Sequence, residues 1–111
     1  FGGSGSDELL GHTGNDFLSG GSGNDLVIGG TGFDTTYGGE GADEFVLSEG
    51  VGYDRIMDFQ NGQDRIEVGA SVDNLSIRNN GRNANIYDGS DLLAVVQGGA
   101  NQLQKEGDFL V

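Results

Sequence analysis

Aspartate recurs every nine residues in the first part of the chain, and a glycine stands two residues before each. No Lys or Arg occurs before Arg55, so no basic side chain in this region can neutralise the carboxylates. The chain has no Cys and one His, which leaves carboxylate and carbonyl oxygens as donors; such sets favour Ca²⁺, which tolerates irregular geometry better than Mg²⁺. We expect several Ca²⁺ ions, held by Asp7, Asp16, Asp25, Asp34 and Asp43 and by turn carbonyls at Gly5, Gly14, Gly23, Gly32 and Gly41.

The elements that position these residues follow from the five blocks GGSGSDELL, GHTGNDFLS, GGSGNDLVI, GGTGFDTTY and GGEGADEFV. Glycines permit a tight turn, and the last three residues of a block, with an apolar residue in the middle, predict a very short strand. Two blocks complete one circuit, so turns on the same side recur every eighteen residues and Asp25 lies between Asp7 and Asp43. Stacked carboxylates repel by roughly 1–4 kcal/mol per pair at surface dielectrics, so a counter-cation is required.

The blocks resemble the GGxGxDxUx pattern of the RTX (repeats-in-toxin) calcium-binding family. The resemblance implies an all-β chain that forms a right-handed parallel β-roll with Ca²⁺ in its turns. Two positions depart from the pattern: His12 replaces the second glycine of its block, and Thr36 replaces the inward apolar residue of its block. We expect Thr36 to weaken the core locally and to mark where the roll reorganises.

The nine-residue period stops after Val46, so we assign residues 1–47 to the roll and 48–111 to a cap rich in antiparallel hairpins. The stretches GYDRIMDF (52–59) and GQDRI (62–66) resemble the caps of serralysin-type proteases and alginate epimerases. That resemblance implies that Asp54, Asp58 or Asp64 helps to close the last Ca²⁺ site. The alternative is that these aspartates pair with Arg55 and Arg65 or face solvent.

Composition restricts the partners and the compartment. A net charge of −13 over 111 residues repels nucleic acid and anionic membranes. Self-repulsion and 23 glycines should keep the repeats unfolded without cation, so that folding and Ca²⁺ binding are one transition. Extracellular Ca²⁺ modules bind at about 10⁻⁴–10⁻³ M, which predicts a chain that folds outside the cell. The ending Asp-Phe-Leu-Val (108–111) resembles the C-terminal signal of bacterial type I secretion substrates.

We find no catalytic set in the sequence, because the single His12 stands in a repeat turn without a nucleophile or a zinc-ligand spacing. Two non-enzymatic functions remain open. One is a structural and export module of a larger secreted protein; the other is a self-assembling Ca²⁺-dependent filament, surface layer or matrix protein. Apolar residues are expected to point outward from the roll, where either the C-terminal half or another copy would cover them: Leu10, Phe17, Leu26, Ile28 and Tyr37.

Overall fold

The computed structural model describes residues 2–47, 52–60, 63–68, 75–89, 91–98, 103–106 and 109–111. These residues form strands and no helix, so the described part of the chain has no helix that could cross a membrane. Phe1, Gly62 and Asp108, the last being part of the expected secretion signal, lie outside the described residues. The strands are β1 Glu8–Leu10, β2 Phe17–Ser19, β3 Leu26–Ile28, β4 Asp34–Tyr37, β5 Glu44–Leu47, β6 Asp54–Ile56, β7 Arg65–Val68, β8 Leu75–Asn80, β9 Asn83–Asp88, β10 Asp91–Val96, β11 Lys105–Glu106 and β12 Phe109–Leu110.

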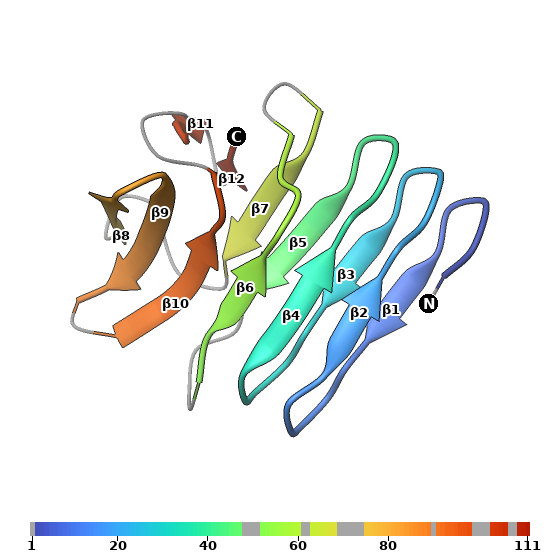
Figure 1. The fold of residues 1–111 in the computed structure, drawn as a ribbon, viewed down its shortest axis with the longest axis horizontal. Helices are drawn as coiled ribbons and strands as arrows, with labels where there is room; N and C mark the ends of the chain where they lie inside the picture. Colours follow the sequence, from blue (N-terminus) through green and yellow to red (C-terminus); the bar gives the residue numbers. More distant parts are fainter. Residues whose placement is uncertain are drawn as a thin grey trace.

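The first seven strands alternate between two sheets, as the repeat predicts (Figure 1). The first sheet has the order β1-β3-β5-β7-β12-β11, and the second has the order β2-β4-β6-β10-β9-β8. Neighbours among β1 to β7 run parallel, which makes this part a flattened coil with turns along both long edges. The expected all-β parallel roll is therefore confirmed.

The inward residues of the coils stack in register across each sheet. Leu9 pairs with Val27 and Val27 with Phe45, so the offset between coils is eighteen residues. Phe45 then pairs with Ile66 in β7, where three extra residues are absorbed before the strand. In the second sheet two extra residues precede β6, where Thr36 pairs with Ile56. Parallel stacking thus continues beyond the last nine-residue block.

Thr36 is fully enclosed in the core although it is polar. Its side chain is buried, and its hydroxyl donates a hydrogen bond to the carbonyl of Arg55 at 3.1 Å. A buried hydroxyl that has an acceptor does not carry the penalty of an unsatisfied group. The spacing does not change at this strand: Asp43 still follows Asp34 by nine residues, and the inserted residues come later, between β5 and β6.

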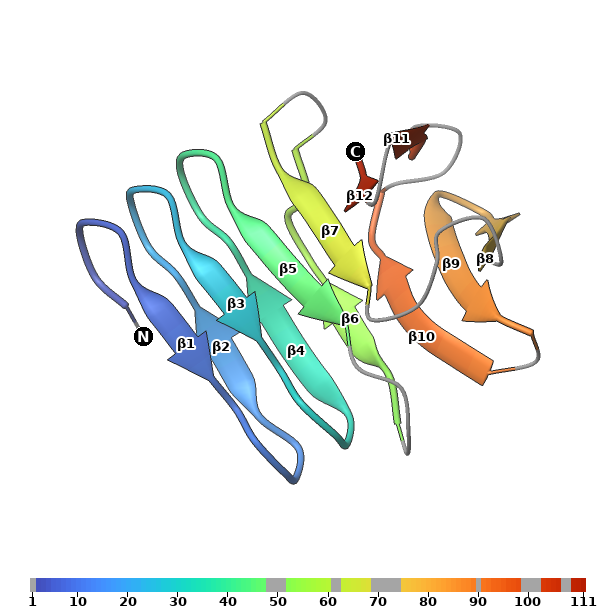
Figure 2. The same cartoon turned by 180° about the vertical axis from the view of Figure 1, so that it is seen from behind.

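The second half of the chain extends the two sheets at their edges (Figure 2). β8, β9 and β10 form an antiparallel meander, and β10 also pairs in parallel with β6, Asp54 opposite Ala94. β12 pairs antiparallel with β7. These additions satisfy the backbone groups that β6 and β7 would otherwise leave at open edges.

This placement corrects the expectation that the C-terminal half covers the outward apolar residues. Leu10 and Phe17 remain 47% and 55% exposed, and Leu26, Ile28 and Tyr37 are half-buried by neighbours within the roll. Phe17, for example, packs against Tyr37 of the next coil with ring centroids 5.4 Å apart. The cap lies beside the roll because open strand edges need hydrogen bonds, whereas scattered outward side chains have no such requirement.

Candidate metal-binding turns

The repeat aspartates lie where each turn leads into a strand, in two stacks on opposite edges of the roll (Figure 1). In each stack, Oδ1 of one aspartate accepts the backbone N–H of the aspartate in the preceding coil. Asp25 accepts from Asp7 at 2.8 Å, and Asp43 accepts from Asp25 at 2.9 Å. On the other edge, Asp34 accepts from Asp16 at 2.8 Å. The eighteen-residue stacking predicted from the repeats is therefore present as a ladder of carboxylate-to-amide bonds.

The second oxygen of each repeat aspartate has no partner. Oδ2 is buried without a hydrogen bond in all five, namely Asp7, Asp16, Asp25, Asp34 and Asp43. Leaving a charged acceptor buried and unsatisfied costs several kcal/mol, and native proteins rarely do so once. Five buried carboxylate oxygens without a hydrogen-bond donor, each at the same repeat position, indicate a common ligand that carries positive charge.

The first glycine of each block forms the floor beneath this oxygen. A Cβ at Gly20 would lie 2.4 Å from Asp25 Oδ2 and 2.6 Å from the carbonyl oxygen of Gly38. A Cβ at Gly2 would lie 2.6 Å from both Asp7 Oδ2 and the Gly20 carbonyl oxygen. A carboxylate oxygen and a carbonyl oxygen of the next coil therefore converge on a space that any side chain would fill.

The fourth-position glycines, which the sequence marked as ligands, take part in a different contact. Each has positive φ, as at Gly23 with 102°. A Cβ at Gly23 would lie 2.3 Å from the carbonyl oxygen of Gly5, so that carbonyl faces the glycine of the following coil. Their role as Ca²⁺ ligands stays a prediction. The carbonyls that face the same space as the unpartnered Oδ2 atoms belong instead to first-position glycines, which sequence analysis treated only as turn formers: Gly20, Gly29 and Gly38.

Asp54 extends the stack on the second edge with a side-chain oxygen. It is opposite Asp34 in the parallel pair β4–β6, and a Cβ at Gly29 would meet both Asp34 Oδ2 at 2.7 Å and Asp54 Oδ1 at 3.0 Å. Burial and then the adjacent Asp34 charge raise the pKa of Asp54 to about 8, and burial raises the pKa of Asp34 as well. Two buried carboxyls at one position suit a divalent cation. Ligation by Asp54 stays a prediction that this proximity supports.

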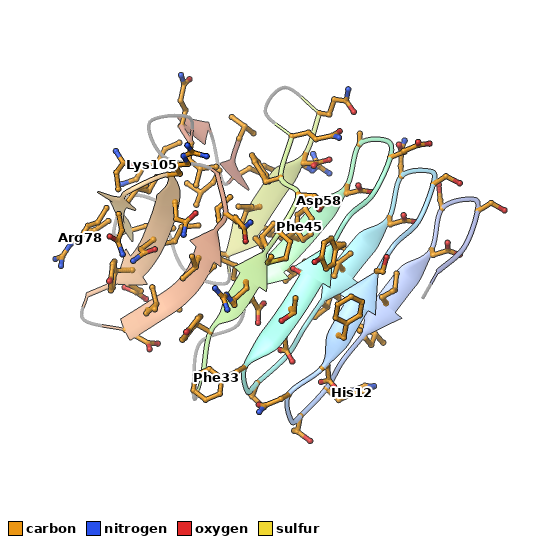
Figure 3. The ribbon with its side chains drawn as sticks, in the orientation of Figure 1. His12, Phe33, Phe45, Asp58, Arg78 and Lys105 are labelled. Carbon is orange, nitrogen blue, oxygen red and sulfur yellow. The ribbon has the colours of Figure 1, made fainter. Side chains whose placement is uncertain are left out.

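Asp64 and Asp58 end the other stack, and each has both oxygens hydrogen-bonded. Asp64 accepts the Asp43 N–H through Oδ1 at 2.8 Å and the Gln60 N–H through Oδ2 at 2.9 Å. Asp58 accepts the N–H groups of Gly38 and Gly39 at 2.8 Å each (Figure 3). These bonds describe caps of the last turn, and metal ligation by either residue stays untested. Burial raises the pKa of Asp64 and brings that of Asp43 to about 6.

His12 occupies a glycine position at a cost in backbone strain. Its φ is 69°, the only positive φ of a non-glycine residue among the described residues. Its side chain is exposed at the turn (Figure 3), and its carbonyl oxygen would lie 2.0 Å from a Cβ at Gly30. His12 therefore acts as a turn residue, as the repeat pattern predicts.

The donor set fits a hard cation bound by mixed ligands. Among the described residues, no three or more His, Cys, Asp or Glu side chains lie together so that they could hold a metal ion. A cation here would therefore need backbone carbonyls in addition to carboxylates. Ca²⁺ accepts such sets readily. The residues that would hold it are the repeat aspartates through Oδ2, with the carbonyls of the first-position glycines beside them.

Comparison with known proteins agrees with this geometry. The family described as the RTX calcium-binding nonapeptide repeat (4 copies) matches residues 1–36 and 26–53. A search among curated proteins found no match. Among solved structures, the chain is similar to the AlgE6R3 subunit of a mannuronan C5-epimerase from Azotobacter vinelandii, with 29% identity over 88% of this chain and 74% of that one and a TM-score of 0.51. Residues 1–53 of this chain therefore carry repeats that match the RTX calcium-binding nonapeptide repeat family.

Proposed function

We propose that the chain is a non-enzymatic structural module that folds when it meets millimolar Ca²⁺ outside the cell. The observation that carries this proposal is the set of five buried, unpartnered Oδ2 atoms, one in each repeat. Each is a charge that the fold buries and leaves uncompensated, so the folded roll should be unfavourable until a cation binds. Ca²⁺ binding energy then becomes folding energy.

The module serves, in this proposal, as part of a larger secreted protein. The likeness to AlgE6R3, a subunit of a mannuronan C5-epimerase, supports this role. A chain that stays unfolded at low cytosolic Ca²⁺ remains exportable, and it becomes compact on arrival. Type I secretion, which the resemblance of the repeats to the RTX family implies, is the route that fits.

The test is a Ca²⁺ titration followed by circular dichroism and light scattering. Starting in chelator, the strand signal should rise cooperatively between about 10⁻⁴ and 10⁻³ M Ca²⁺. Mg²⁺ at the same concentration should fail, because it requires near-octahedral geometry that mixed carbonyl sets rarely offer. Full strand signal in chelator, or an equal response to Mg²⁺, would refute the proposal.

A second candidate, binding of an acidic polysaccharide, is favoured by one row on the outer face of the second sheet. The row crosses β4, β6, β10, β9 and β8 and consists of Thr35, Arg55, Val95, Asn85 and Arg78. It contains two exposed arginines and no acid in a strongly acidic chain. The similar AlgE6R3 subunit comes from an enzyme named for mannuronan, a polymer of uronic acids. Retention on immobilised mannuronan that disappears in Arg55→Ser/Arg78→Ser would support this candidate; equal retention of both proteins would exclude it.

A further inference from the structure

The glycine floors beneath the unpartnered aspartate oxygens are not built alike. At three of these floors the second oxygen that converges on the glycine is a backbone carbonyl of the next coil. At Gly11, for example, a Cβ would lie 2.8 Å from Asp16 Oδ2 and 2.5 Å from the carbonyl oxygen of Gly29. At Gly29 a Cβ would meet two side-chain oxygens instead, Asp34 Oδ2 and Asp54 Oδ1. Among the described residues, only the floor at Gly29 brings two carboxylates together.

The carboxylate of Asp54 reaches this floor because it is not engaged with the amide of the preceding coil. Elsewhere the next aspartate accepts that amide, as Asp43 Oδ1 accepts the Asp25 N–H at 2.9 Å. The Asp34 N–H donates instead to the backbone carbonyl of Tyr53 at 3.3 Å. Asp34 and Asp54 are 1% and 5% exposed, so two carboxylates lie side by side out of solvent.

This pair attracts a cation more strongly than one carboxylate and a neutral carbonyl do. The number of charged ligands is one of the properties that set the affinity of a protein site for Ca²⁺. Even at the dielectric constant of water, a further unit charge about 4 Å from a divalent ion strengthens binding by more than about tenfold. A bound cation also removes the repulsion between the Asp34 and Asp54 carboxylates. The floor at Gly29 should therefore bind its ion more tightly than the carbonyl floors.

We infer that the floor at Gly29 is the primary cation site of the chain and that Asp54 determines its affinity. This inference rests on Ca²⁺ being the ion of the turns, as proposed above, and adds an order of filling. The first Ca²⁺ binds between β4 and β6, and the carbonyl floors fill at higher concentration. The chain therefore responds to Ca²⁺ in two stages and retains one ion when the others have dissociated.

Tyrosines next to the floors on the two edges make the order of filling observable. Tyr53 directly precedes Asp54, and its ring centroid lies 5.2 Å from that of Phe33, which is exposed at this turn (Figure 3). Tyr37 directly precedes Gly38, a floor on the opposite edge. An excited tyrosine transfers energy to bound Tb³⁺, an ion that also prefers oxygen ligands, only over short distances. Emission through Tyr53 therefore reports the primary site, and emission through Tyr37 reports the opposite edge.

A Tb³⁺ titration of the full chain, with tyrosine-sensitised emission as the signal, tests the order of filling. At one Tb³⁺ per chain, Tyr53→Phe should remove most of the emission, and Tyr37→Phe should leave it unchanged. As further Tb³⁺ is added, the emission that depends on Tyr37 should appear. Emission at one equivalent that is lost in Tyr37→Phe, or lost equally in both variants, would overturn the inference.

Calorimetric titration with Ca²⁺ tests the contribution of Asp54. Asp54→Asn keeps the shape of the side chain and removes its charge, so the affinity for the first ion should fall by at least about tenfold. Asp16→Asn is the matched control, because it makes the same change on the same edge at a carbonyl floor, and it should leave the affinity for the first ion unchanged. Equal losses in the two variants would show that Asp54 does not determine the primary site.

Circular dichroism of the same samples separates this inference from the proposed function. A strand signal that rises with Ca²⁺, together with equal losses of emission in Tyr53→Phe and Tyr37→Phe, overturns the order of filling and leaves Ca²⁺-driven folding intact. Full strand signal in chelator overturns the folding proposal, and the comparison of the two tyrosine variants then still decides whether the floor at Gly29 fills first.

Discussion

The two oxygens of each repeat carboxylate have different tasks. Oδ1 accepts an amide of the preceding coil, and Oδ2 is left for a cation. A single aspartate thus links backbone order to metal binding. Asp25 combines both tasks in the middle of a stack, whereas Asp7, in the first coil that the structure describes, accepts no such bond among the described residues.

This difference predicts that Asp25→Ala damages Ca²⁺-dependent folding more than Asp7→Ala does. Both changes remove one Oδ2, but only Asp25→Ala also removes the acceptor of a repeat amide, the partly buried N–H of Asp7. A hydrogen bond to a charged group contributes about 1.5–3 kcal/mol. The Ca²⁺ concentration at the folding midpoint should therefore be at least about tenfold higher for Asp25→Ala than for Asp7→Ala. Calorimetric Ca²⁺ titration measures this, and equal midpoints would contradict the alternation of roles along the stack.

His12→Gly should stabilise the Ca²⁺-bound fold. Glycine relieves the left-handed backbone strain, worth about 1–2 kcal/mol. Part of this stabilisation is lost because glycine also gives the unfolded chain more conformational freedom. The net increase in unfolding free energy should be about 0.5–1 kcal/mol, measured by urea denaturation. Thr13→Gly, one residue later and without positive φ, is the control and should destabilise the protein.

At the scale of the coil, glycine allows two backbones to come into contact. Two glycines with the same φ show whether this contact or the φ angle is the reason that glycine is needed. Gly30 and Gly3 both have φ of 86°, but only Gly30 lies against a carbonyl of the preceding coil. Gly30→Ala should therefore cost about 1–3 kcal/mol more than Gly3→Ala, because the coils must separate to admit the methyl group. Thermal denaturation in Ca²⁺ at high dilution compares them; losses of the same size would show that φ alone demands glycine.

The last turn depends on Asp58 in a manner that the repeats do not show. Asp58→Ala leaves the Gly38 and Gly39 amides without acceptors, which should lower the unfolding free energy by about 1–3 kcal/mol. Glu40→Ala, an exposed change in the same turn, should have little effect. If Asp58 were a metal ligand as well, Asp58→Ala would also lower the number of Ca²⁺ ions bound at saturation, which calorimetric titration counts.

The sequence contained enough to predict β1 to β5, because turn glycines, a central apolar residue and aspartate repeat with one spacing. It did not reveal that β6 and β7 continue the stack, since their offsets from the preceding coil exceed eighteen by two and three residues while Asp54 and Asp64 keep their places beside Asp34 and Asp43. The parallel pairing of β10 with β6 joins residues forty apart, Asp54 and Ala94, and no local pattern encodes it. The sequence also did not identify the carbonyls of the first-position glycines as candidate ligands, because every residue has a backbone carbonyl and the residue type does not show where it points.

For the whole molecule, proton uptake should partly replace Ca²⁺. Burial raises the pKa of Asp43 to about 6 and that of Asp54 to about 8, above the ordinary value near 3.8. Acids with raised folded-state pKa values bind more protons when folded, so the Ca²⁺-free fold gains stability as pH falls from 8 toward 4 and loses it as pH rises. Ca²⁺ competes with these protons, so its midpoint should rise over the same fall in pH.

Circular dichroism in chelator and in Ca²⁺, at several pH values from 4 to 8, measures both effects. As the pH falls, we expect the strand signal in chelator to increase and the affinity for Ca²⁺ to decrease, because both effects come from protonation of the same buried acids. Greater Ca²⁺-free stability at pH 8 than at pH 5 would contradict the burial of these carboxyls.

The edge-wise order of the strands also gives the molecule a mechanical polarity. Each coil touches only the coil before and the coil after it, and the terminal coil has one neighbour. Tension along the chain would therefore open the repeat coils one at a time. Each step frees eighteen residues, or roughly 60 Å of extended chain. The module would therefore lengthen in equal steps under load and shorten again when Ca²⁺ binds to the turns.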